Sequence, residues 1–163
     1  MTMPSLKTKI MSHELRLGWL WVALVSSSVI IYFLLAPRYS AQWQPPLPLE
    51  QREMIKTLLY SVAIISLPMT NLMRHVLLRL NATMPFSKKA LHIVAKRRYA
   101  LTVLLTMAMI ESIAVYGFVM VMIGESFNNF YIFESIALLG IYLHRPKMVE
   151  YQQIIENLEL IHE

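Results

Sequence analysis

Residues 99–123, YALTVLLTMAMIESIAVYGFVMVMI, decide the fold, because they hold one charged side chain, Glu111, in twenty-five positions. A helix rises about 1.5 Å per residue, so this run exceeds the roughly 30 Å hydrocarbon core of a bilayer. An apolar run of this length is typical of a membrane-spanning helix. We therefore expect an integral membrane protein.

Three further apolar runs predict three more spans. Residues 17–36 carry no charge. A cleaved signal peptide is the competing interpretation, but its apolar core would be about 7–15 residues, and Pro37 stands where cleavage would be needed. Residues 55–78 predict a second span kinked by Pro68, where Ser66 or Thr70 would satisfy freed backbone groups. Residues 127–143 predict a fourth span that is short for a full crossing.

The segments between these runs predict loops and a helical tail. Residues 37–53 contain four prolines, and residues 79–98 are strongly basic. Residues 146–163 predict an amphipathic helix, because apolar side chains recur at spacings of three and four between 148 and 161, with Pro146 in the first turn. The expected fold is all-α, a single membrane domain over residues 1–163, with four transmembrane helices and a C-terminal cytoplasmic amphipathic helix.

The distribution of Lys and Arg predicts the orientation of these spans. Twelve of the fifteen basic residues fall in the N-terminal segment, the 74–98 stretch and the tail, and three fall in the two opposite connections. Basic residues accumulate on the cytoplasmic side of membrane proteins. We expect both termini in the cytoplasm and a multi-pass protein of a cell (inner) membrane.

Composition excludes several classes of function. The chain is 56% hydrophobic and 15% charged, whereas soluble domains have about 25% charged residues. It has no Cys and no Asp, so disulfides, thiol catalysis and Asp dyads are excluded. The net charge of +5 lies in the segments beside the spans, which disfavours nucleic-acid binding. The five His are scattered, and no nucleotide or nucleophile motif occurs. We expect no metal, no cofactor and no enzymatic activity.

The candidate functional residue is Glu111, halfway along the longest apolar run. A charged side chain at the bilayer centre costs about 2.5–3.5 kcal/mol on insertion scales, and desolvation favours the neutral acid. Such a carboxyl can bind and release a proton or a cation. The alternative is a protonated Glu that holds neighbouring helices together by a hydrogen bond.

Two other charged residues are candidates of lower rank. Glu134 lies near the start of the fourth run, where we expect a solvated interfacial acid, with a second site in an ion path as the alternative. Arg74 ends the second span, where we expect an orientation anchor that could also pair with a lipid phosphate or a carboxyl.

Residues 99–124, YALTVLLTMAMIESIAVYGFVMVMIG, resemble the acid-bearing helix of the proteolipid (c) subunits of rotary ATP synthases and ATPases. In that family the acid binds the translocated proton or Na⁺, so the resemblance assigns this role to Glu111. A basic loop precedes the family's helix, as residues 88–98 do here. The second span differs, since it has no glycine and contains Pro68. The chain is also similar to small four-span bacterial membrane proteins with such a helix.

The expected partners are membrane lipids and protein. The apolar face of residues 148–161 predicts contact with the basic loop, with a second copy of the chain or with a subunit of a larger membrane complex. The polar face of the tail carries four Glu, which disfavours contact with anionic lipid. A structural or assembly role is therefore the second functional hypothesis.

Overall fold

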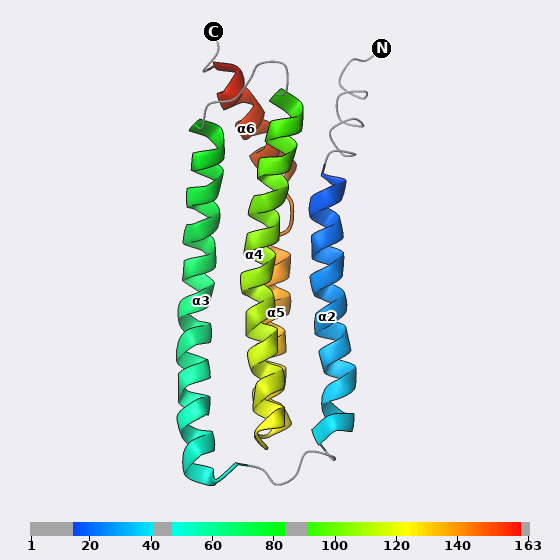
Figure 1. Ribbon diagram of the computed structural model, residues 1–163, viewed down its shortest axis with the longest axis vertical. Coiled ribbons are helices and arrows are strands. Elements are labelled where there is room, and N and C mark those ends of the chain that lie inside the picture. Colours follow the sequence, from blue (N-terminus) through cyan, green and yellow to red (C-terminus); the bar gives the residue numbers. More distant parts are fainter. Residues whose placement is uncertain (1–14, 41–46, 84–90, 161–163) are drawn as a thin grey trace.

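The computed structural model describes residues 15–40, 47–83 and 91–160, and these form five helices without a strand among them. The helices are α2 (Arg16–Ser40), α3 (Leu49–Thr83), α4 (Leu91–Met122), α5 (Phe127–Leu143) and α6 (Met148–Leu160). Figure 1 shows α2 to α5 standing side by side with alternating chain direction, and α6 at one end. We call this the tail end, and the opposite end, with the α4–α5 connection, the turn end.

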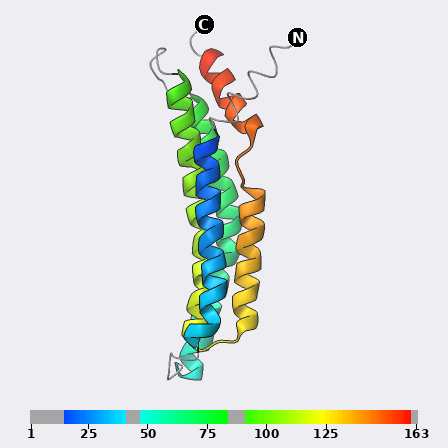
Figure 2. The same cartoon turned by 90° about the vertical axis from the view of Figure 1, so that its right-hand side faces the viewer.

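The central helix of the bundle is α4. It packs against α2, α3, α5 and α6, whereas α2 and α3 make little direct contact with each other. In Figure 1, α4 stands between α2 and α3, and in Figure 2, α5 stands to one side of the other three long helices. The helix with the longest apolar run therefore forms the axis around which the others are arranged.

The core follows α4 along its length. The main cluster joins α4 to its neighbours through fully or nearly fully buried side chains: Val25, Val29, Val103, Met107, Ile110, Ala114, Ala137, Tyr151, Ile154 and Leu158. A second cluster at the turn end contains Ala63, Ile113, Met120 and Phe133. Burial of such side chains and their close packing hold the helices together.

The helices α4 and α5 approach each other closely at Gly117. A Cβ atom placed there would lie 2.8 Å from the Cβ of Phe133 and 3.3 Å from the carbonyl oxygen of Phe130. On α5, Gly140 makes a similar approach, with its missing Cβ 3.0 Å from Cγ2 of Ile110. Small residues let helix backbones approach closely in membrane proteins. The connection between these two helices contains Gly124, whose φ of 91° suits glycine.

The outer surface of the bundle is also apolar. Exposed large hydrophobic side chains line both α2 and α3, among them Leu20, Leu24, Ile31, Leu34, Leu58, Ile64, Ile65 and Leu72. The helices α2, α3 and α4 are long and apolar enough to cross a membrane, and α5 is a shorter apolar helix. A helix that is hydrophobic all round needs an apolar environment on both faces. These features are consistent with a multi-pass membrane protein.

The helices extend into segments that the sequence predicts as loops. The expected loop 37–53 is wrong at both ends, since α2 runs through Pro37 to Ser40 and α3 begins at Leu49. The carbonyl of Pro48 accepts the first bond, from the N–H of Arg52, and proline is compatible with a helix start. Ala36, which is fully buried, packs the last turn of α2.

The expected loop 79–98 is also wrong in part, because residues 79–83 belong to α3 and residues 91–98 belong to α4. Two hydrogen bonds join these extensions: Asn81 Nδ2 donates to the carbonyl of Arg98 at 3.2 Å, and Arg98 Nη1 donates to the carbonyl of Asn81 at 3.1 Å. These bonds satisfy polar groups on both helices beyond the apolar region. Residues 84–90 lie outside the described part of the chain.

Two proline expectations are corrected. Pro68 lies inside α3, but the hydroxyls of Ser66 and Thr70 donate to the carbonyls of Val62 and Ser66 and not to the carbonyl of Ile64. Hydroxyls in helices commonly bond to the carbonyl four residues earlier. Pro146 lies before α6, which begins at Met148, and it packs close to Gly18 on α2.

Candidate functional site

Three polar side chains from three helices lie in the apolar part of the bundle. Glu111 on α4 is half-buried, and the hydroxyl of Tyr32 on α2 lies within electrostatic range of it. The same Tyr32 hydroxyl lies within electrostatic range of Glu134 on α5. Tyr32 is therefore near two acids that are twenty-three positions apart in the sequence.

The environment of Glu134 differs from the expected one. We expected a solvated acid, but its side chain is only 3% exposed, and neither carboxyl oxygen has a hydrogen-bond partner among the described residues. The helical period explains the burial. Glu134 follows Phe133, which packs at the Gly117 contact, and it shares the inward face of α5 with Ala137 and Ile141. The expectation was wrong because position along the chain does not indicate which face of a helix is covered.

A small crevice lies beside Glu134 between α2 and α5. Its volume is about 180 Å³, and its lining is mostly apolar and aromatic: Val29, Ile30, Phe33, Tyr131, Glu134, Ser135 and Leu138. Water-sized groups fit a space of this size. The buried carboxyl of Glu134 therefore borders a space that is large enough to hold water.

A second polar cluster lies at the tail end around Arg74, which is 5% exposed. Its Nη2 is 2.6 Å from Oε2 of Glu150 on α6, and its Nε is 3.4 Å from Oε1 of the same carboxylate. Its Nη1 donates to the carbonyl of His144 at 2.6 Å, and Nη2 donates to the carbonyl of Arg145 at 3.3 Å. The structure shows one of the roles expected for Arg74, which is pairing with a carboxyl group, here that of Glu150.

Tyr99 on α4 completes this cluster. Its hydroxyl donates toward Oε2 of Glu150 and the carbonyl of Lys147, both at 3.1 Å, and accepts the N–H of Lys147 at 2.7 Å. Glu150 is thus held by a guanidinium and a hydroxyl from two helices of the bundle. Together with Arg74, these contacts fix the start of α6 against α3 and α4.

The apolar face of α6 covers the tail end of the bundle. Tyr151, Ile154 and Leu158 are buried there, and Met148 and Ile155 are partly buried. The expected apolar face included Ile161, which lies outside the described residues. The described tail therefore directs its hydrophobic face to its own bundle.

Sequence analysis missed Tyr32, Tyr99 and Glu150 as members of these clusters. The partners of Arg74 and Glu111 lie on other helices, and local spacing carries no information about such pairs. The only indication in the sequence was that Tyr32 and Tyr99 are polar side chains within apolar runs. Among residues 15–40, 47–83 and 91–160, no group of three or more His or Glu side chains is placed to hold a metal ion.

His144 gives the tail end a predicted dependence on pH. Its ring is 7% exposed, and Nδ1 lies 3.0 Å from the carbonyl oxygen of Gly140. Burial first, and then the charges of Arg74 and Lys147, lower the pKa of His144 below its usual 6.5, although the Gly140 carbonyl and Glu150 oppose this. The unfolded chain therefore binds more protons than the folded chain below about pH 6.5, so stability falls as pH falls through that region.

The expected result is a midpoint of thermal unfolding that is constant above about pH 7 and decreases toward pH 5. His144→Gln removes this part of the decrease, because the neutral amide does not titrate. His75→Gln is the matched control, since His75 is exposed on α3 and the slope stays. An unchanged slope in the His144→Gln protein contradicts the prediction.

Comparison with known protein families, with curated proteins and with solved structures finds no match to this chain. The candidate sites therefore rest on the geometry of the chain itself.

Proposed function

We propose that this chain is a four-span membrane protein in which Glu111, Glu134 and Tyr32 bind and release a proton or a small cation. The observation that carries the proposal is the Glu134 carboxyl, which is buried without a hydrogen-bond partner among the described residues. The hydroxyl of Tyr32 lies within electrostatic range of both Glu134 and Glu111.

The chemistry follows from the cost of charge in such a place. An unpaired carboxylate in an apolar interior is strongly unfavourable, so the group is protonated or paired with a cation. Binding and release of a single positive charge is the simplest change that such a site supports. Tyr32 provides a polar group within electrostatic range of both acids.

The membrane arrangement has α2, α3, α4 and α5 as the four spans. As a helix of 17 residues, α5 is about 25 Å long, which local thinning of the bilayer accommodates. Among the described residues, the tail end carries eight basic residues, and the turn end carries three, Arg38, Arg52 and Lys56. This asymmetry supports a cytoplasmic tail end, with both termini in the cytoplasm and the chain in a cell (inner) membrane.

The resemblance to the proteolipid subunits of rotary ATPases supports the same role for Glu111. In that family, the acid of the corresponding helix is the ion-binding group. Here Glu134 adds a second carboxyl from α5, which lies outside the resembling stretch 99–124. The proposal therefore concerns ion binding and does not extend to assembly of a rotary ring.

An assembly role in a larger complex is the second hypothesis from the sequence. It depends on an apolar face of the tail that is available to a partner. Tyr151, Ile154 and Leu158 cover this chain's own bundle, so the geometry favours the ion-binding proposal.

The test is modification by dicyclohexylcarbodiimide, which reacts with protonated carboxyls in apolar surroundings. In lipid nanodiscs near pH 6.5, we expect labelling at Glu111 or Glu134, mapped by mass spectrometry. Replacement by Gln of whichever of the two acids carries the label reduces total labelling at least severalfold. Raising the pH, or adding Na⁺, reduces labelling of the unaltered chain, because the reagent requires the protonated acid.

The matched control is Glu53→Gln. Glu53 is an exposed acid at the turn end, paired with Lys56 at 3.3 Å, and its replacement leaves labelling unchanged. The proposal is contradicted if neither Glu111 nor Glu134 is labelled, or if neither replacement reduces the labelling. The variant Tyr32→Phe tests the role of the hydroxyl. We expect this variant to change the pH at which half of the protein is labelled.

A further inference from the structure

The helices α3 and α5 leave a groove between them in the half of the bundle near the tail end. Its volume is about 530 Å³. The main reason for the gap is the central position of α4, which keeps α3 and α5 apart. On α5 the groove is lined by Leu139, Gly140 and Leu143. Beyond Leu143 the chain passes close to α2, where Pro146 packs at Gly18.

The two ends of this groove differ in chemistry. Toward the middle of the bundle, the lining is apolar: Leu67, Pro68, Leu139 and Leu143. Toward the tail end it is polar and mostly basic: Arg74, His75, His144, Lys147 and Glu150. A ligand that fits both ends has a hydrophobic part and a negatively charged part.

The positive charge at the polar end exceeds the negative charge. Glu150 is engaged with Arg74 at 2.6 Å. The Nζ of Lys147 is 4.0 Å from the same carboxylate and its side chain is 51% exposed, so its charge is directed mainly outward. The ring of His75 is exposed on α3 and offers a hydrogen-bond donor.

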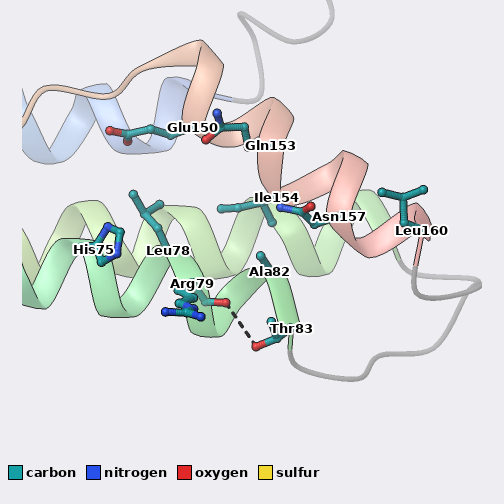
Figure 3. A pocket seen from close by; sticks show the side chains of 10 residues that line it. All are labelled: His75, Leu78, Arg79, Ala82, Thr83, Glu150, Gln153, Ile154, Asn157 and Leu160. Atoms are coloured by element: carbon teal, nitrogen blue, oxygen red, sulfur yellow. Dashed lines mark hydrogen bonds between the residues drawn. The ribbon is translucent and has the colours of Figure 1, made fainter.

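A neighbouring cleft continues the groove along the last turns of α3. It has a volume of about 640 Å³ and lies between α3 and α6. Figure 3 shows His75, Leu78 and Arg79 on α3 and Glu150 and Ile154 on α6 around it. His75, Leu78 and Glu150 line both spaces. Arg79 is exposed and adds a further cation on this side.

We propose that this groove binds an anionic phospholipid. One acyl chain lies between α3 and α5 against Leu139 and Leu143, and the phosphate lies at Lys147 and His75. Basic pockets between helices on the cytoplasmic side of membrane proteins bind the headgroups of anionic lipids. The assignment to the cytoplasmic leaflet, but not the binding itself, rests on the orientation in the proposed function.

Charge and shape favour this occupant over others. A soluble phosphate uses the basic end and leaves the apolar half of the groove exposed. A zwitterionic lipid fits the apolar half, but its headgroup has no net charge to match the surplus of cations. The acidic polar face of α6 does not oppose binding, because the one acid that lines the groove, Glu150, is already paired.

The test uses the full chain and native mass spectrometry with phosphatidylglycerol, phosphatidylcholine and inorganic phosphate as probes. We expect phosphatidylglycerol to remain bound and phosphatidylcholine to bind at least tenfold more weakly. Inorganic phosphate in large excess does not displace the lipid. Lys147→Gln weakens phosphatidylglycerol binding about fivefold, as the loss of one cation near an anionic headgroup predicts.

Two further variants separate the parts of the groove. Asn71→Trp places a large side chain in the groove without a change of charge, and it blocks lipids of both kinds. Arg145→Gln is the matched control: this cation lies two residues from Lys147, over the ring of Tyr142 at 4.4 Å and outside the groove, and its loss leaves binding unchanged.

Several results overturn the lipid proposal. Equal retention of the two lipids, displacement by inorganic phosphate, or equal effects of Lys147→Gln and Arg145→Gln each contradict it. A protein that forms dimers and excludes lipid from the groove shows that a second copy is the occupant. None of these results bears on labelling of Glu111 or Glu134, so this proposal and the ion-binding proposal fail separately.

Discussion

Replacement of Arg74 by glutamine is expected to destabilise the folded chain by about 3–5 kcal/mol and to release α6 from the bundle. Removal of one partner of a buried ion pair leaves the other charge without compensation, and this is the usual size of the loss. Here Glu150 loses its closest ion-pair partner, and the carbonyls of His144 and Arg145 also lose their donor. Unfolding followed by circular dichroism and limited proteolysis of the tail measure the two effects.

The control replaces Glu150, the other member of the ion pair. Glu150→Gln is expected to destabilise the chain by a similar amount. The double variant Arg74→Gln/Glu150→Gln loses clearly less than the sum of the two, because no charge remains unpaired. Glu53→Gln breaks an exposed pair with Lys56 and costs less than about 1 kcal/mol. Strict additivity in the double variant contradicts the assigned pairing.

Replacement of Gly117 by alanine is expected to separate α4 from α5 and to cost about 1–3 kcal/mol. The new Cβ meets the Cβ of Phe133 at 2.8 Å and the backbone oxygen of Phe130 at 3.3 Å, so helix backbones have to move. Alanine is the better helix former by about 1 kcal/mol, which acts in the opposite direction. A net loss of stability therefore reports the clash between the helices.

The matched control for this contact is Gly140→Ala. Its Cβ meets Cγ2 of Ile110 at 3.0 Å, which is a longer contact than the 2.8 Å contact at Gly117 and involves no backbone atom. We expect a midpoint of thermal unfolding in detergent that falls clearly for Gly117→Ala and much less for Gly140→Ala. Equal midpoints for the two variants contradict the close approach at Gly117.

The sequence predicted the helices well where hydrophobicity alone decides them. The apolar runs all lie in helices, and α5 has the same bounds, 127–143, as the run that predicted it. Hydrophobicity indicates which residues avoid water, but it does not mark where a helix ends. Paired side chains such as Asn81 and Arg98 continue α3 and α4 past the apolar region. For this reason the predicted loops were too long.

The candidate site was predictable only as single residues. A charge in an apolar run identified Glu111 without any need for a structure. The burial of Glu134 and its proximity to Tyr32 depend on how three helices are rotated about their axes, and a pattern along one helix does not contain that information. The same applies to Arg74 and Glu150, which are seventy-six positions apart. Pairs of this kind are a property of the assembled bundle.

The central position of α4 also has a consequence for biogenesis. In the proposed membrane arrangement, α2 and α3 enter the bilayer first as the chain leaves the ribosome, yet they have little direct contact with each other. In that arrangement they remain in lipid as independent helices until α4 arrives and packs against both. Only then do α5 and α6 have a surface on which to settle. A chain that stops before α4 is expected to be a target for membrane proteases, because its two helices have no common partner.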